Sequence, residues 1–132
     1  SSWSCAHGVG RWKEFCGCHT GANPHWQQNW RAQLRSTLDW LRDTVNPVFL
    51  KMASKLLKDP WQARNDYIDI ILDKDTKVVK AFLKAHLKNS AYHRGIEETV
   101  LALLEIQRHL LNMYTSCGWF FDFFAHLIFY LI

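Results

Sequence analysis

The chain has 132 residues, 48% of them hydrophobic, which is typical of one globular domain and excludes an intrinsically disordered protein. Sixteen Lys and Arg residues stand against twelve Asp and Glu residues, and the net charge of +4 is spread along the chain rather than gathered in one block. We therefore expect no nucleic-acid partner. Since Ser1 is followed by no hydrophobic leader, we expect a cytoplasmic piece of a longer protein.

Residues 1–26 are the part of the sequence richest in chemically capable side chains. They contain three of the four cysteines, three of the seven histidines, three of the seven tryptophans and four of the six glycines. Glycine permits positive φ and a close approach of the main chain to a ligand. The glycine patterns of phosphate-binding loops are missing from the sequence. The composition predicts a loop that holds a metal or a ligand other than a phosphate.

The cysteines of this loop allow three interpretations. Reduced, buried cysteines beside a tight turn are the preferred one, with no cofactor expected. A site for zinc or another soft metal is the alternative, although a single residue between ligands is fewer than the roughly two to four usual in zinc sites. Disulfides are the third, but the chain is large enough to fold without them. The candidate metal ligands are Cys5, His7, Cys16 and Cys18.

Three Asx-Pro pairs predict helix starts after the loop, because Asn or Asp caps a helix and proline suits its first turn. These pairs are Asn23-Pro24, Asn46-Pro47 and Asp59-Pro60. The third opens the segment WQARNDYIDIILD, and its apolar residues are expected to face inward: Trp61, Ile68, Ile71 and Leu72.

Two further helices are predicted from residue spacing. The segment TKVVKAFLKAHLK has lysines on one side and on the other Val78, Val79, Phe82, Leu83 and Leu87. A long helix from about Gly95 to Tyr114 has an apolar stripe of Ile96, Val100, Leu103, Leu104, Leu110 and Leu111. The predicted fold class is all-α: a bundle or array of about five to six helices over residues 27–118, preceded by the Gly/Cys/Trp-rich loop.

The last segment, residues 119–132, has 12 apolar residues among its 14. It is shorter than the roughly 18 to 20 residues that span a bilayer, and Asp122 and His126 interrupt it. We expect a buried helix rather than contact with a membrane. With the loop and the helices, residues 1–132 are predicted to form a single helical domain.

Seven tryptophans are an unusual number for this length, and four of them lie within the first 30 residues. Flat aromatic rings can stack on sugars while polar side chains bind the hydroxyls, but such rings also fill cores. Composition alone favours core filling. The glycines and His7 around them make the loop a candidate wall of a carbohydrate subsite.

The segments CAHGVGRW, CGCHTG and YTSCGWFFD together resemble a known family. They are similar to a helical domain of unknown function, family 3536, that follows the catalytic barrel in glycoside hydrolase family 57-like proteins. The resemblance implies a helical segment that closes the cleft of an enzyme acting on α-glucans. It also implies that the front loop and residues 116–122 fold against one another as two walls of that cleft. The residues expected to line it are Trp3, His7, Gly8, Trp12, Trp119 and Asp122.

Family 57 enzymes are expected to carry their Glu nucleophile and Asp acid/base on the barrel. A retaining glycosidase needs two carboxyl groups about 5–5.5 Å apart, and nothing marks such a pair among the twelve acids of this chain. We therefore predict no catalytic residue here, only a substrate-lining part that needs a separate catalytic barrel and is inactive alone. Two alternatives are a metal-stabilised helical binding module and a helical interaction domain whose apolar tail packs on a partner.

Overall fold

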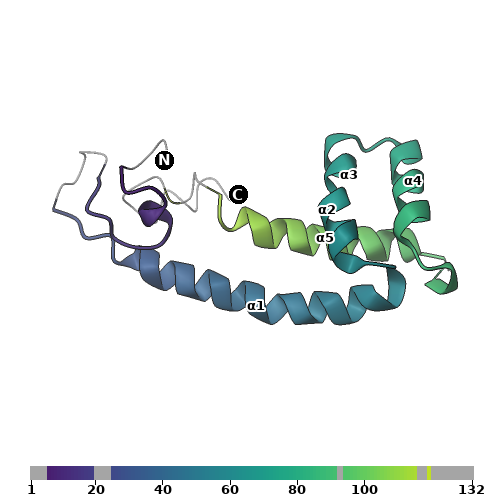
Figure 1. The fold of residues 1–132 in the computed structure, drawn as a ribbon, viewed down its shortest axis with the longest axis horizontal. Helices are drawn as coiled ribbons and strands as arrows, with labels where there is room; N and C mark the ends of the chain where they lie inside the picture. Colours follow the sequence, from purple (N-terminus) through teal and green to yellow (C-terminus); the bar gives the residue numbers. More distant parts are fainter. Residues whose placement is uncertain (1–5, 20–24, 92–93, 116–118, 120–132) are drawn as a thin grey trace. The chain divides into compact units, whose positions relative to one another are not determined.

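The structure is a computed structural model that describes residues 6–19, 25–91, 94–115 and Trp119. In these ranges the α-helices are α1 (Trp30–Leu56), α2 (Pro60–Asp66), α3 (Ile68–Leu72), α4 (Thr76–His86) and α5 (Ile96–Asn112) (Figure 1). Short 3-10 turns occur at Gly10–Trp12 and Asn89–Ala91, and these described residues contain no β-strand. The predicted all-α fold class is confirmed.

The chain divides into two compact units. One consists of Ser1–Asp43 together with Leu110–Ile132, and the other is Thr44–His109. We call them the motif-rich unit and the helical unit. The division falls inside α1 and inside α5, so each of these helices contributes residues to both units.

Helix α1 runs through Pro47 without a break, so the helix start predicted at Asn46-Pro47 is wrong. Proline lacks an amide hydrogen and removes one bond of the helix ladder, which usually ends or kinks a helix. Here the next turns bury Phe49, Ala53 and Leu57, all 2% exposed or less. We attribute the continuation to this burial, and two expected helices therefore form one.

The hydrophobic core cluster lies in the helical unit. Its buried members are Phe49, Ala53, Leu57, Ala63, Tyr67, Ile70, Val79, Phe82, Leu83, Leu87, Ile96, Val100, Leu103 and Leu104. The inward faces predicted for α4 and α5 are largely confirmed, although Leu111 is 57% exposed. An antiparallel bridge between Leu57 and Leu87 ties the end of α1 to the end of α4.

The inward face expected for residues 61–72 is wrong at three of its four positions, whereas Ile71 is half-buried and packs against the core cluster as expected. Trp61, Ile68 and Leu72 are 36%, 48% and 79% exposed. The buried stripe is instead Ala63, Tyr67 and Ile70. These are spaced by four and three residues, as one face of a helix requires, and Tyr67 separates α2 from α3. Apolar residues occur on two faces of this segment, so hydrophobicity alone does not identify the buried face.

A partly buried polar contact joins α5 to the junction between α2 and α3. The Tyr67 hydroxyl donates to Glu105 Oε1 at 2.6 Å, and Arg108 pairs with the other oxygen of Glu105 at 2.9 Å. Burial, helped by Glu105, raises the pKa of Tyr67 to about 12. The hydrogen bond from Tyr67 lowers the pKa of Glu105, and this effect and that of Arg108 outweigh the opposing effect of burial.

We expect Tyr67→Phe to lower the free energy of unfolding by about 1.5–3 kcal/mol near neutral pH, the usual worth of a hydrogen bond to a charged group. A depressed folded-state pKa gives stability that is present above the unfolded value and lost as pH falls through the folded value. The difference between the two proteins should therefore shrink in acid. It should shrink again between about pH 10 and 12, where wild-type Tyr67 must ionise on unfolding. Urea unfolding at several pH values measures it, and a difference independent of pH would contradict the linkage.

No helix in the described ranges is long and apolar enough to cross a membrane. Of the predicted C-terminal segment, Trp119 alone lies among the described residues.

Candidate functional site

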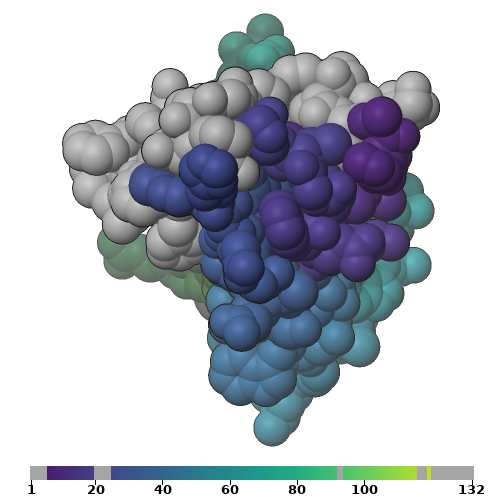
Figure 2. Space-filling model, turned by 90° about the vertical axis from the view of Figure 1, so that its left-hand side faces the viewer, coloured from purple at the N-terminus to yellow at the C-terminus, as the bar shows by residue number. Residues whose placement is uncertain are grey.

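Residues 6–19 of the motif-rich unit form a loop that folds back on itself. The Gly10 amide donates to the His7 carbonyl at 3.2 Å, and the Gly10 carbonyl accepts two amides of the next turn at 2.9 Å each. Gly8 and Gly17 have φ of 64° and 81°, a left-handed conformation that favours glycine. Figure 2 shows the loop in purple at the surface, beside the blue residues that begin α1.

Three soft-metal donors meet on this loop. The Cys18 sulfur lies 3.4 Å from His7 Nδ1, and ligand atoms of His7, Cys16 and Cys18 all lie within 4.8 Å of one another. Both cysteines are thiols and half-buried, whereas His7 is exposed. The structure therefore brings together three of the four residues of the alternative metal set. Cys5, the fourth, lies outside the described residues.

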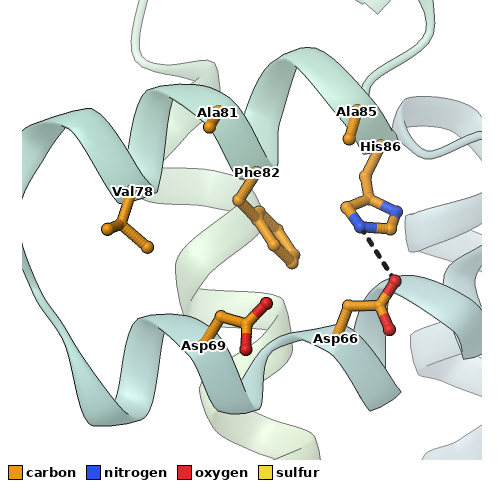
Figure 3. Close-up of a pocket in the computed structure, with 7 residues that line it drawn as sticks. All are labelled: Asp66, Asp69, Val78, Ala81, Phe82, Ala85 and His86. Carbon is orange, nitrogen blue, oxygen red and sulfur yellow. Dashed lines mark ion pairs between the residues drawn. The ribbon is translucent and has the colours of Figure 1, made fainter.

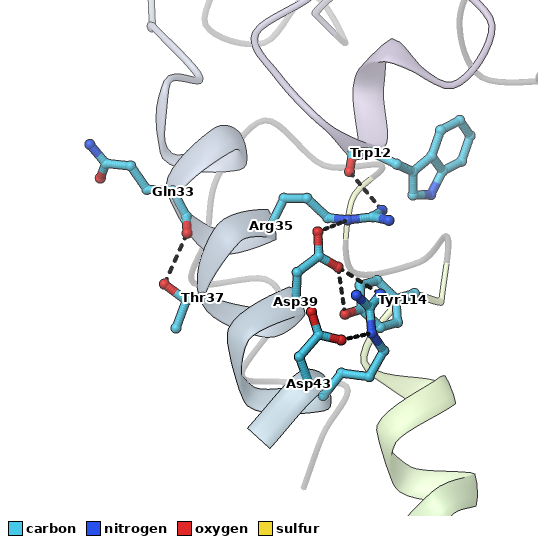
Figure 4. A network of polar contacts seen from close by, with 8 residues as sticks. Trp12, Gln33, Arg35, Thr37, Asp39, Asp43 and Tyr114 are labelled. Carbon is cyan, nitrogen blue, oxygen red and sulfur yellow. Dashed lines mark hydrogen bonds and ion pairs between the residues drawn. The ribbon is translucent and has the colours of Figure 1, made fainter. Parts of the chain in front are cut away.

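A charged network joins the loop and Tyr114, two residues after the end of α5, to helix α1 (Figure 4). Arg35 donates to the Trp12 carbonyl at 3.3 Å and to Asp39 at 3.1 Å. The other oxygen of Asp39 accepts from the Tyr114 hydroxyl at 2.8 Å and from Arg42 at 2.9 Å. The Arg35 guanidinium also lies 4.7 Å from the centre of the Tyr114 ring.

This network stabilises the structure and does not act as an acid–base pair. Burial raises the pKa of the Asp39 carboxyl, but hydrogen bonds from Tyr114 and Arg35 outweigh it and the net pKa is lowered. Burial and the bond to Asp39 raise the pKa of Tyr114. Asp39 therefore stays ionised and Tyr114 neutral, so neither is prepared to exchange a proton near neutral pH. The helical spacing of Arg35, Asp39 and Arg42 is visible in the sequence, but nothing there points to Tyr114.

Three polar side chains are buried among the described residues of the motif-rich unit. Arg11, Gln28 and Arg31 are at most 3% exposed. Trp119 is 1% exposed and stacks on Trp30, with ring centroids 6.2 Å apart and planes inclined by 24°. Buried polar side chains cost free energy unless they are paired. They are often retained for specificity or function, and reasoning from the sequence did not single out these three.

The predicted substrate-lining residues differ in accessibility. His7 is exposed, and Gly8 and Trp12 are half-buried. Trp119 is buried, so in this chain its ring supports Trp30 rather than presenting an open face. Trp3 and Asp122 lie outside the described residues. An indole not included in the prediction, Trp26, is 44% exposed just before α1.

The helical unit has a groove of about 400 Å³ beside helix α4 (Figure 3). It is lined by Asp66, Asp69, Val78, Ala81, Phe82, Ala85 and His86. His86 Nε2 lies 3.3 Å from Asp66 across the groove, and the Phe82 ring is 4.5 Å from the His86 ring. The other lining residues are mostly small or apolar. Because its charged groups largely face each other, this groove is a weaker candidate than the loop.

One protein family matches most of the chain. The family described as a domain of unknown function (DUF3536) matches residues 26–127, which are 102 of the 132 residues. The match begins at Trp26, so the loop residues His7, Cys16 and Cys18 precede it. Neither the curated proteins nor the solved structures gave a match. Since the family model covers more than three quarters of the chain, this protein belongs to the family described as a domain of unknown function (DUF3536).

Proposed function

We propose that this chain is the substrate-lining helical part of a family-57-like enzyme acting on α-glucans, with the bond-breaking carboxylates on a separate catalytic barrel. The observation that carries the proposal is the meeting of the two motif segments on the start of α1. Trp119 of the second segment stacks on Trp30, and Trp12 of the front loop is bound to Arg35. The resemblance implies that these two segments lie against one another as two walls of one cleft.

The side chains of the loop suit a sugar. His7 is exposed and can donate a hydrogen bond to a hydroxyl. The half-buried Trp12 ring points away from Arg35 (Figure 4) and offers an apolar face for C–H groups. Such residues position a sugar and exclude water without taking part in bond cleavage. The proposed enzyme is cytoplasmic.

Binding of maltoheptaose to the 132-residue protein tests the proposal. We expect weak, saturable binding with a Kd in the range of about 1 mM, measured by calorimetry, and no cleavage of the sugar. Trp12→Ala should weaken it about 2- to 10-fold, which corresponds to the loss of one ring contact. The substitution keeps the main-chain carbonyl that accepts from Arg35. Trp40→Ala is the matched control, because Trp40 is exposed on α1 at a distance in sequence from the loop.

Three results of the same titration would contradict the proposal. No detectable binding of maltoheptaose, or equal weakening by Trp12→Ala and Trp40→Ala, removes the loop as a sugar wall. Equal binding of cellohexaose, which has β-linkages, removes the α-glucan assignment. Trp12 is the test residue rather than His7, because His7 also belongs to the cysteine cluster.

A further inference from the structure

We propose that His7, Cys16 and Cys18 bind one soft metal ion, zinc in the first instance. The proposal rests on the mutual placement of three donors and does not depend on the sugar-binding role of the loop. His and Cys are the side chains that zinc prefers. Three of them within 4.8 Å of one another are close to one coordination sphere.

The distances fit a tetrahedral ion. With Zn–S near 2.3 Å and Zn–N near 2.0–2.1 Å, tetrahedral ligand atoms lie about 3.5–3.8 Å apart. Cys18 Sγ and His7 Nδ1 are already 3.4 Å apart. The widest separation in the cluster is at most 4.8 Å, so a contraction of about 1 Å would bring the three donors to three corners of a tetrahedron and leave the fourth position for water or another ligand. Rotation of exposed or half-buried side chains supplies such a movement.

The backbone of the loop holds the donors toward each other. Gly17 separates the two cysteines and has φ of 81°. A Cβ atom on Gly10 would lie 3.5 Å from the Cβ atoms of both His7 and Cys16. Gly10 is buried between the two ligand-bearing ends of the loop. A ligand set held by tight turns loses less conformational entropy when the ion binds.

The donor set also favours particular ions. Two thiolates and one imidazole are too soft for Mg²⁺ or Ca²⁺, which take oxygen ligands. Among first-row divalent ions they suit zinc. Binding through Nδ1 of His7 leaves its Nε2–H at the surface as a hydrogen-bond donor of fixed orientation. The metal would therefore set the direction in which His7 presents its remaining polar group.

The predicted function of the ion is to close the loop. It would link residue 7 to residues 16 and 18 and so constrain the ten residues between the outer ligands. Because the turns already hold the three donors near one another, the ion should restrict this loop further rather than fold it from an unfolded state. The hydrophobic core of the helical unit contains none of the three ligands, so its fold should not require the metal.

Titration of the reduced 132-residue protein with zinc alone tests the proposal. We expect one equivalent to bind with release of about two protons, because both thiols must ionise to become ligands. Cobalt used as a second probe should give a sulfur-to-cobalt charge-transfer absorption and the intense visible bands of a tetrahedral site. Cys16→Ser and Cys18→Ser should each weaken zinc binding on the order of 100-fold or more, beyond the effect of losing an outer-shell contact.

Two further variants make the result decisive. His7→Ala should keep the sulfur-to-cobalt absorption but weaken metal binding. His25 is an exposed histidine outside the cluster, so His25→Ala should leave metal binding unchanged. Far-ultraviolet circular dichroism of each variant checks that the helices remain folded. Absence of the charge-transfer band in the folded wild-type protein overturns the proposal. So does zinc affinity that is the same in wild type and in the Cys16→Ser/Cys18→Ser double variant.

Discussion

Replacing Trp119 by alanine is expected to lower the free energy of unfolding of the motif-rich unit by about 3–5 kcal/mol, the usual cost of truncating a buried aromatic ring. Trp119 is 1% exposed and stacks on Trp30. The truncation removes this stacked pair and leaves a cavity where the ring is now buried. Such a loss is a large part of the stability of a small protein.

Urea unfolding followed by near-ultraviolet circular dichroism measures the effect, since this signal reports fixed aromatic side chains. Trp40→Ala is the matched control: the same substitution is made at a position that is 65% exposed, and a change within about 0.5 kcal/mol is expected there. If both variants lost the same stability, the stacking of Trp119 on Trp30 would not be a major contact in solution.

Leu104→Ala should destabilise the helical unit by about 2–5 kcal/mol, the usual range for truncating a buried leucine. Leu104 is fully buried within the core cluster. Removing its side chain loses buried apolar contacts and leaves a cavity that the surrounding helices fill incompletely. Leu72→Ala offers a control of identical chemistry, because Leu72 is 79% exposed.

Thermal and urea unfolding followed by the helical far-ultraviolet signal compare the two variants. The Leu104 variant should unfold at a clearly lower urea concentration with a similar slope, and the Leu72 variant should match wild type. A Leu72→Ala protein as unstable as Leu104→Ala would mean that α3 packs differently from the arrangement described here.

Local patterns predicted much of the helical unit. The spacing of Val79, Phe82 and Leu83 identified both the helix α4 and its buried face, and Asp59-Pro60 correctly marked the start of α2. Such signals lie within a few residues of one another. Pro47 shows their limit: the same Asx-Pro signal occurs there, but the burial of Phe49 and Ala53 in neighbouring turns decides the outcome.

The candidate site was predictable in composition but not in geometry. The sequence shows His7, Cys16 and Cys18 within twelve residues, and tight turns at the glycines determine whether their donors meet. Contacts between distant residues left no local signal. Tyr114 and Asp39 are 75 positions apart, and one hydrogen bond between them cannot be derived from periodicity.

The motif-rich unit is assembled from both ends of the chain, whereas the helical unit is one continuous stretch. A continuous stretch can fold through contacts that are closer in sequence, which favours rapid formation. The contact of Asp39 with Tyr114 and that of Trp30 with Trp119 each join residues at least 75 positions apart, so each must first overcome the entropy of closing a long loop. We therefore expect the chain to form the core of its helical unit first and its loop-bearing unit last.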